Sequence, residues 1–148
     1  MADKSKTGME FPEFSFELER GKIRELVQAI GDTNAVYVDQ VTAQQEGYKD
    51  TPAPPTFVTL PVMWSSMLFR ALKDLDIGLN KVLHGEESYT YFQEVYPGDI
   101  LTGRMKVVSM DTKSGKSGEI DLISLETVYR NQKEEQVIQA NTLIVERK

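Results

Sequence analysis

The sequence contains no cysteine and only one histidine, His84. The lack of cysteine excludes disulfide bonds, thiolate metal sites and a cysteine nucleophile, and we predict no metal site. No run of about 18 apolar residues occurs, and the N-terminus lacks the apolar core of a signal peptide. These absences predict a soluble, cytoplasmic protein.

Basic residues are in the minority, with 17 lysines and arginines against 23 aspartates and glutamates and a formal net charge of −6. This balance argues against binding to nucleic acid or to an anionic membrane, and we expect neither as a partner. The 148 residues are enough for one domain with a real core. Residues 1–10 are polar and are expected to form a flexible N-terminal tail, which leaves 11–148 as a single domain.

The first third of the chain carries short helical patterns. Residues 11–19 alternate between apolar and polar and predict a short strand. Residues 22–30 place apolar side chains at i, i+3, i+4 and i+7, which predicts an amphipathic helix. Gly31 follows at the position where a left-handed residue ends helices. Asp39 is a predicted N-cap for a second short helix over 40–46.

The most apolar stretch is 57–75, which follows a proline-rich connection over 51–55. Its apolar residues cover most of a helical circumference, which predicts one long buried helix. Pro61 fits the first turn of that helix. On this prediction, replacing Trp64 or Leu68 by alanine should cost about 3–5 kcal/mol of stability.

The C-terminal half is predicted to be an antiparallel sheet. Alternating apolar residues predict strands over 82–95, 100–110, 119–129 and 136–146, with a hairpin loop over 113–118. One buried helix and a long antiparallel sheet have a simple solution, in which the sheet wraps around the helix. The fold class is therefore α+β, and the architecture is the hot-dog fold.

The loop after the first helix carries the motif on which a family resemblance depends. MaoC-like hot-dog dehydratases and hydratases have a Gly-Asp-x-Asn-Pro-x-His motif with Asp or Asn two residues after the histidine. This chain resembles them through Gly31, Asp32, Asn34 and Asp39. Ala35 replaces the proline, and Tyr37 replaces the histidine. The resemblance implies action on acyl thioesters of coenzyme A or acyl carrier protein (ACP), without a cofactor.

Five further strings resemble the N-terminal, fatty-acid-synthase-type branch of that family. They are Arg24-Glu25, Gly47-Tyr48-Lys49, Ala53-Pro54-Pro55-Thr56-Phe57, Leu83-His84-Gly85-Glu86 and Tyr96-Pro97-Gly98-Asp99. This branch includes histidine-lacking subunits of heterodimeric (3R)-hydroxyacyl-ACP dehydratases, which help to enclose the acyl chain. The resemblance therefore implies a MaoC-like catalytic subunit as a partner, or a second copy of the chain itself.

The chemistry of this family assigns roles to particular positions. Hydration of an enoyl thioester needs a base for water, an acid for the α-carbon and donors for the thioester oxygen. The resemblance places Asp32 and Tyr37 at the catalytic positions, but a phenol with a reference pKa of about 10 is a poor general base. The substrate-binding candidates are Asn34, Thr56, Phe57, His84 and Tyr89.

Each candidate also has a purely structural interpretation. Asp32 and Asn34 could brace the turn, and Tyr89 could belong to the core. The lone His84 is more often structural than catalytic in such a position. Three functions follow: the acyl-chain-binding half of a heteromeric dehydratase, a self-sufficient homodimeric hydratase using Asp32 with Tyr37 or His84, and a non-catalytic acyl-CoA-binding module. We rank them in that order.

Overall fold

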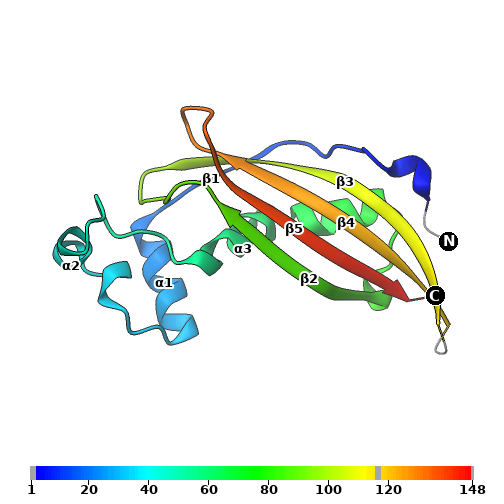
Figure 1. Ribbon diagram of the computed structural model, residues 1–148, viewed down its shortest axis with the longest axis horizontal. Coiled ribbons are helices and arrows are strands. Elements are labelled where there is room, and N and C mark those ends of the chain that lie inside the picture. The colour runs from blue at the N-terminus through cyan, green and yellow to red at the C-terminus, as the bar shows by residue number, and fades with distance from the viewer. Residues whose placement is uncertain (1–2, 116–117, 148) are drawn as a thin grey trace.

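The sheet has five antiparallel strands in the order β1-β3-β4-β5-β2 (Figure 1). The structure is a computed structural model and describes residues 3–115 and 118–147. The strands are β1 (Phe14–Glu17), β2 (Val82–Tyr91), β3 (Ile100–Gly115), β4 (Gly118–Arg130) and β5 (Gln136–Arg147). The predicted α+β class, with a long antiparallel sheet in the C-terminal half, is confirmed.

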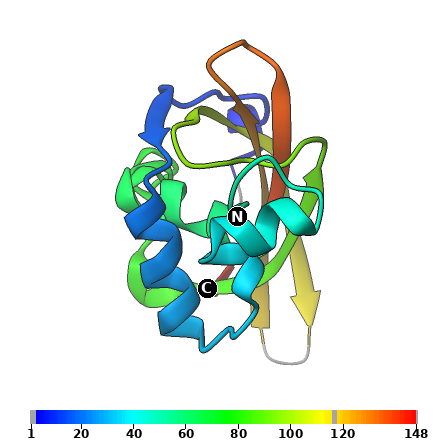
Figure 2. The ribbon, with the colours of Figure 1, turned by 90° about the vertical axis from the view of Figure 1, so that its left-hand side faces the viewer.

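Helices α3 and α4 lie on one side of this sheet (Figure 2). The α-helices are α1 (Arg20–Ile30), α2 (Gln40–Gln45), α3 (Thr59–Trp64) and α4 (Met67–Asp74). Short 3-10 turns are η1 (Lys4–Lys6), η2 (Ala35–Tyr37), η3 (Pro55–Val58) and η4 (Leu79–Lys81). Helices α3 and α4 run behind the strands, whereas α1 and α2 lie beyond one end of the sheet (Figure 1).

The core lies between the sheet and the helices α3 and α4. Along β4, every second residue from Ile123 to Tyr129 is buried, and Ala71 and Leu72 of α4 belong to the same buried cluster. Burying each large apolar side chain contributes about 1.5–3 kcal/mol, so this alternation fixes which face of the sheet meets the helices. The face that results forms one wall of the candidate site.

The helical stretch over 57–75 differs from the prediction, because it is three pieces and not one long helix. Turn η3 leads into α3, and Ser66 adopts a left-handed conformation (φ 56°) before α4. The Ser65 hydroxyl donates to the carbonyl of Val62, and serine side chains that bond the nearby backbone compete with helix continuation. As a result, Trp64 is 46% exposed and not buried, and Leu68 is only partly buried.

Two strand boundaries also differ from the prediction. Strand β2 ends at Tyr91, and Val95 is buried in the following loop, where its carbonyl accepts from the Ala53 N–H at 2.9 Å. In the predicted hairpin loop, residues 113–115 belong to β3 and Gly118 to β4. Residues 116–117 of that loop lie outside the described residues.

The segment expected to be a flexible tail lies along β3 from Gly8 onward. The Gly8 N–H donates to the Val107 carbonyl at 2.9 Å, and Val107 N–H donates to the Met9 carbonyl at 2.9 Å. Phe11 N–H donates to the Met105 carbonyl at 2.9 Å. These bonds continue the pairing of β1 with β3, so residues 8–11 extend the edge of the sheet that β1 forms. Whether residues 3–7 are flexible stays a prediction, and residues 1–2 lie outside the described part.

A close contact at Gly103 leads to a first prediction. A Cβ atom at Gly103 would lie 2.3 Å from the ring of Phe14, which packs edge-on against Tyr129 at 6.0 Å between ring centroids. Gly103→Ala is expected to lower the free energy of unfolding by about 1–3 kcal/mol, because the buried ring must move. Urea unfolding measures this. Gly21→Ala in α1, where an added Cβ meets no atom within 4 Å, is the control and should not destabilise.

A bidentate ion pair ties the start of α1 to the proline-rich connection. Arg20 donates to both carboxylate oxygens of Asp50 at 2.8 and 2.7 Å, and also to the Thr51 hydroxyl at 2.8 Å. The Arg20 guanidinium is the main reason that the pKa of Asp50 is lowered, with the Thr51 N–H helping. This pair fixes where the chain enters the segment that leads to α3.

The Asp50 pair predicts a pH-dependent stability. The pKa of Asp50 in the folded chain is below its unfolded value of about 3.9. The ion pair therefore contributes its full stability above pH ~3.9, and that contribution is lost as the pH falls through the folded pKa. Asp50→Asn is expected to cost about 1 kcal/mol at neutral pH, after allowing for solvent screening of the partly exposed Arg20. Urea unfolding at neutral pH and below pH ~3 checks this. An equal loss at both values contradicts the pairing.

Candidate functional site

The loop after α1 places Asp32 and Asn34 on a tight turn. Helix α1 ends at Gly31 in the left-handed conformation (φ 68°), as the sequence predicted. The Asp32 carboxylate accepts from the Asn34 N–H at 2.8 Å, and the Asn34 side chain accepts from the Val36 N–H at 3.1 Å. Both side chains therefore brace the turn, and both are exposed at the loop surface.

Tyr37 lies half-buried near Asp32. Burial raises the pKa of Tyr37, and the charges of Asp32, Tyr48 and Glu94 act in the same direction. The phenol therefore stays protonated at neutral pH and can donate a hydrogen bond. It therefore lacks an unprotonated nitrogen like the one with which the histidine of the resembled motif takes up a proton.

The start of the helical stretch offers few donors to a thioester oxygen. The Phe57 N–H already donates to the Pro54 carbonyl at 2.8 Å, and prolines have no N–H to donate. The Phe57 side chain is 1% exposed and packs against Phe16 and Trp64, with ring centroids 5.9 and 6.4 Å apart. Thr56 is exposed beside it. Phe57 is therefore mainly a core residue.

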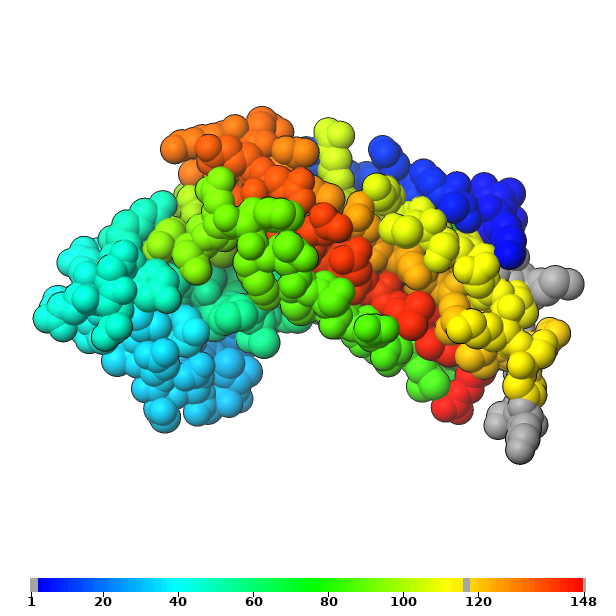
Figure 3. Space-filling model, in the orientation of Figure 1, coloured from blue at the N-terminus to red at the C-terminus, as the bar shows by residue number. Residues whose placement is uncertain are grey.

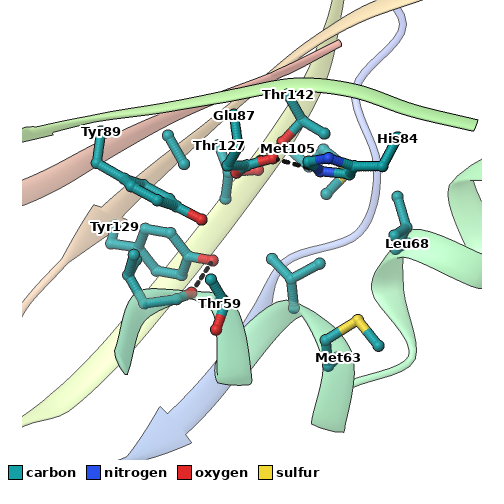
Figure 4. Close-up of a pocket in the computed structure, with 13 residues that line it drawn as sticks. Thr59, Met63, Leu68, His84, Glu87, Tyr89, Met105, Thr127, Tyr129 and Thr142 are labelled. Carbon is teal, nitrogen blue, oxygen red and sulfur yellow. Dashed lines mark hydrogen bonds and ion pairs between the residues drawn. The ribbon is translucent and has the colours of Figure 1, made fainter. Parts of the chain in front are cut away.

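A cavity of about 290 Å³ lies between the helices α3 and α4 and the strands β2 to β5 (Figure 4). Its size is near the lower end of ligand pockets. Its walls are mostly apolar atoms, with hydroxyl groups and one carboxylate among them. The lining residues are Val58, Thr59, Val62, Met63, Leu68, His84, Glu87, Tyr89, Met105, Thr127, Tyr129, Ala140 and Thr142.

A polar cluster, formed by His84, Glu87, Tyr89 and Thr142, lies on the β2–β5 wall of this cavity. His84 Nε2 is 2.9 Å from Glu87 Oε2, and the Thr142 hydroxyl donates to Glu87 Oε1 at 3.0 Å. Burial raises the pKa of Tyr89, and the charge of the neighbouring Glu87 raises it further. Figure 4 shows the hydroxyls of Tyr89 and Tyr129 pointing into the cavity.

A β-bulge at Gly85 explains why His84 and Glu87 face the same way. Residues three apart on a regular strand point to opposite faces, but the register of β2 against β5 shifts between His84 and Glu86. A Cβ at Gly85 would lie 2.9 Å from the Val145 side chain and 3.2 Å from the Leu143 carbonyl. Glycine at this position therefore permits the bulge that builds the polar cluster.

The structure sorts the predicted site residues into two groups on different elements. Asp32, Asn34 and Tyr37 share the loop after α1, whereas His84 and Tyr89 meet on the wall of the cavity. Sequence reasoning did not identify the cavity residues Glu87, Thr127, Tyr129 and Thr142. A glycine inside a strand pattern is a bulge signal, and at Gly85 it could have pointed to the pairing of His84 with Glu87.

Two absences hold for residues 3–115 and 118–147. No three histidine, aspartate or glutamate side chains gather there in a way that could hold a metal ion. Within the same part of the chain, no helix is long and apolar enough to cross a membrane.

A family model described as "FAS1-like, dehydratase domain region" matches residues 5–140. The chain belongs to this family. The match confirms the resemblance to MaoC-like dehydratases. A UPF0336 protein of Streptomyces avermitilis is 33% identical to this FAS1-like dehydratase chain over 152 residues, which cover 98% of the chain and 95% of the relative. A UPF0336 protein of Thermobifida fusca is 31% identical over 138 residues, with 93% and 88% covered.

Solved structures share the fold of the FAS1-like dehydratase chain. The C-terminally truncated HadBC (3R-hydroxyacyl-ACP dehydratase) complex of Mycobacterium tuberculosis matches with a TM-score of 0.80 and 24% identity, covering 95% of this chain and 96% of that one. A MaoC-like dehydratase matches with a TM-score of 0.84 and 24% identity, covering 96% of this chain and 42% of that one. The ChsH1–ChsH2 complex of M. tuberculosis has a TM-score of 0.77 and 21% identity, with 93% and 84% covered. These matches establish the hot-dog fold.

Proposed function

We propose that this chain is the acyl-chain-binding subunit of a (3R)-hydroxyacyl-thioester dehydratase, or enoyl-thioester hydratase, whose substrate is carried by coenzyme A or ACP. The observation that carries the proposal is the mostly apolar cavity between the sheet and the helices α3 and α4. Each methylene group buried there contributes about 0.8 kcal/mol, so such walls suit an acyl chain.

The catalytic base is expected to come from a second subunit. Tyr37 stands where the motif has histidine, and its raised pKa makes it unsuitable for activating water. A MaoC-like subunit with the histidine would take the proton of the water that adds to the β-carbon, while a proton is delivered to the α-carbon. This chain would hold the remainder of the acyl chain.

The open edge of β2 is a suitable surface for that partner. Strand β2 pairs with β5 on one side, and no strand of the described residues pairs with its other side. It is ten residues long, and it borders a hollow between the helical end and the strand ends of the molecule (Figure 3). The opposite edge consists of two short pieces, residues 8–11 and the four residues of β1, with Pro12, which lacks an N–H, between them. Strand pairing is therefore favoured at β2.

The proposed function is tested by a hydration assay with crotonyl-coenzyme A. The purified chain alone should show no turnover, and the partner alone should show little. Activity should appear when the chain is mixed with a co-purifying MaoC-like subunit. Strong turnover by the chain alone would contradict the proposal. Tight acyl-CoA binding without turnover, with every candidate partner present, would instead assign a non-catalytic binding module.

A second candidate is a self-sufficient homodimeric hydratase, and one observation favours it. The pairing of His84 with Glu87 at 2.9 Å places an imidazole and a carboxylate together on the cavity wall. Such a pair is a suitable general base in principle. In that case the chain alone should turn over crotonyl-coenzyme A, and His84→Ala or Asp32→Asn should abolish the activity.

A further inference from the structure

Glu87 is an unusual residue for a cavity that binds only an alkyl chain. Its side chain is 23% exposed, and it lies among walls that are otherwise mostly apolar. An alkyl chain that filled the cavity would remove the remaining water from this carboxylate. Removing water from a charged group without supplying a new hydrogen bond is unfavourable, so a plain alkyl chain is a poor match for this wall.

The hydrogen bonds of the polar cluster define what kind of group it still accepts. A carboxylate has about four acceptor positions, and His84 and Thr142 take up two of those on Glu87. The donors of His84 and Thr142 are thus already engaged, while acceptor positions are left on Glu87. A ligand group that donates a hydrogen bond fits this arrangement better than a group that only accepts one.

Tyr129 adds a donor across from the polar cluster. Its hydroxyl lies 3.5 Å from the Val58 carbonyl, which is long for a hydrogen bond, and it points into the cavity (Figure 4). A ligand group that reaches both residues can donate to Glu87 and accept from Tyr129. A hydroxyl does both, whereas a ketone oxygen can only accept and a methylene group can do neither.

We propose that the cavity selects acyl chains that carry a hydroxyl group beyond the reacting carbons, with Glu87 as the acceptor of that hydroxyl. The inference rests on the proposed function, since it names the substrate class of the same cavity. Glu87 and Tyr129 are specificity-determining residues in this view. His84 and Thr142 are positioning residues that hold the Glu87 carboxylate toward the ligand.

The test compares acyl chains of one length that differ only in oxygen. Isothermal titration calorimetry with the purified full chain would use octanoyl-coenzyme A, a set of hydroxyoctanoyl-coenzyme A isomers with the hydroxyl at successive distal carbons, and the matching oxo compounds. At least one hydroxy isomer is expected to bind about tenfold more tightly than octanoyl-coenzyme A, as one hydrogen bond to a charged group would give. The matching oxo compound should bind no more tightly than octanoyl-coenzyme A.

Two variants connect the preference to Glu87. Glu87→Leu should remove the preference for the hydroxy isomer and keep or improve the binding of octanoyl-coenzyme A. Glu87→Gln, which preserves the shape of the side chain, should give a weaker preference and serves if the leucine variant does not fold. Glu86→Leu is the matched control. It removes the same charge next to Glu87, but Glu86 lines a different depression with Ser88 and Leu143.

The outcomes separate this inference from the proposed function. Equal affinity for octanoyl-coenzyme A and every hydroxy isomer would overturn the hydroxyl preference alone, as would a preference that persists in Glu87→Leu. Tighter binding of an oxo compound than of its hydroxy analogue would also overturn it. Binding of none of the thioesters would overturn the acyl-binding function itself.

Discussion

Phe57→Ala is expected to lower the free energy of unfolding by about 3–5 kcal/mol. Phe57 is 1% exposed and sits where η3 meets the core, with the rings of Phe16 and Trp64 on its sides. Removing the ring leaves a cavity that the rigid sheet and the proline-rich connection cannot close. Urea unfolding followed by circular dichroism measures the loss.

Trp64→Ala is the informative comparison, because the sequence pattern alone predicts a loss of similar size. In the structure, Trp64 keeps almost half of its surface exposed. Its ring lies 5.1 Å from Phe16 and 6.4 Å from Phe57 between centroids, and 5.0 Å from the Lys22 ammonium. Its replacement should cost only about 1–2 kcal/mol. Equal costs for Phe57→Ala and Trp64→Ala would contradict the interruption of the helical stretch at Ser66.

Tyr37→His is expected to give the chain alone an enoyl-thioester hydration rate about 10²-fold above the uncatalysed background, which is the rate expected with wild type. Histidine titrates near pH 6.5, so an imidazole at this position can act as a base where the phenol cannot. Asp32, whose charge already acts on Tyr37, would hold the imidazole in its working orientation. The rate should stay below that of a complete enzyme, because the Phe57 N–H already donates to Pro54 and cannot serve as an oxyanion donor. Loss of one such donor lowers kcat by a factor of about 10²–10³.

The measurement is the initial rate with crotonyl-coenzyme A in the absence of any partner. Tyr37→Phe is the control, because it removes the hydroxyl without adding a base and should give no gain. Adding Asp32→Asn to Tyr37→His should remove the gain. If Tyr37→His has the wild-type rate, the loop after α1 does not meet the thioester, and the base must act elsewhere.

Much of the fold follows from local patterns that the sequence shows. The helical spacing of the apolar residues in α1 predicts the helix, and the glycine at its end predicts the left-handed conformation of Gly31. The alternating C-terminal half predicts the long strands of the sheet. These features are determined by nearby residues, and they are the ones that the structure reproduces.

The features that were missed depend on competition or on distant residues. The apolar pattern over 57–75 predicts a continuous helix. In the structure, the Ser65 hydroxyl bonds the nearby backbone, and Ser66 adopts a left-handed conformation between α3 and α4. The polar cluster needs Glu87 of β2 beside Thr142 of β5, 55 residues away, together with a bulge at Gly85. No local periodicity contains that pairing.

The unequal edges of the sheet set a limit on stoichiometry. A sheet with two long open edges could add copies at both sides and grow without end, as fibres do. Here β2 offers ten consecutive strand residues for pairing, while the opposite edge is broken at Pro12 into residues 8–11 and the four residues of β1. Two chains that join through β2 use up the long edge of each, so growth by strand pairing stops at a pair.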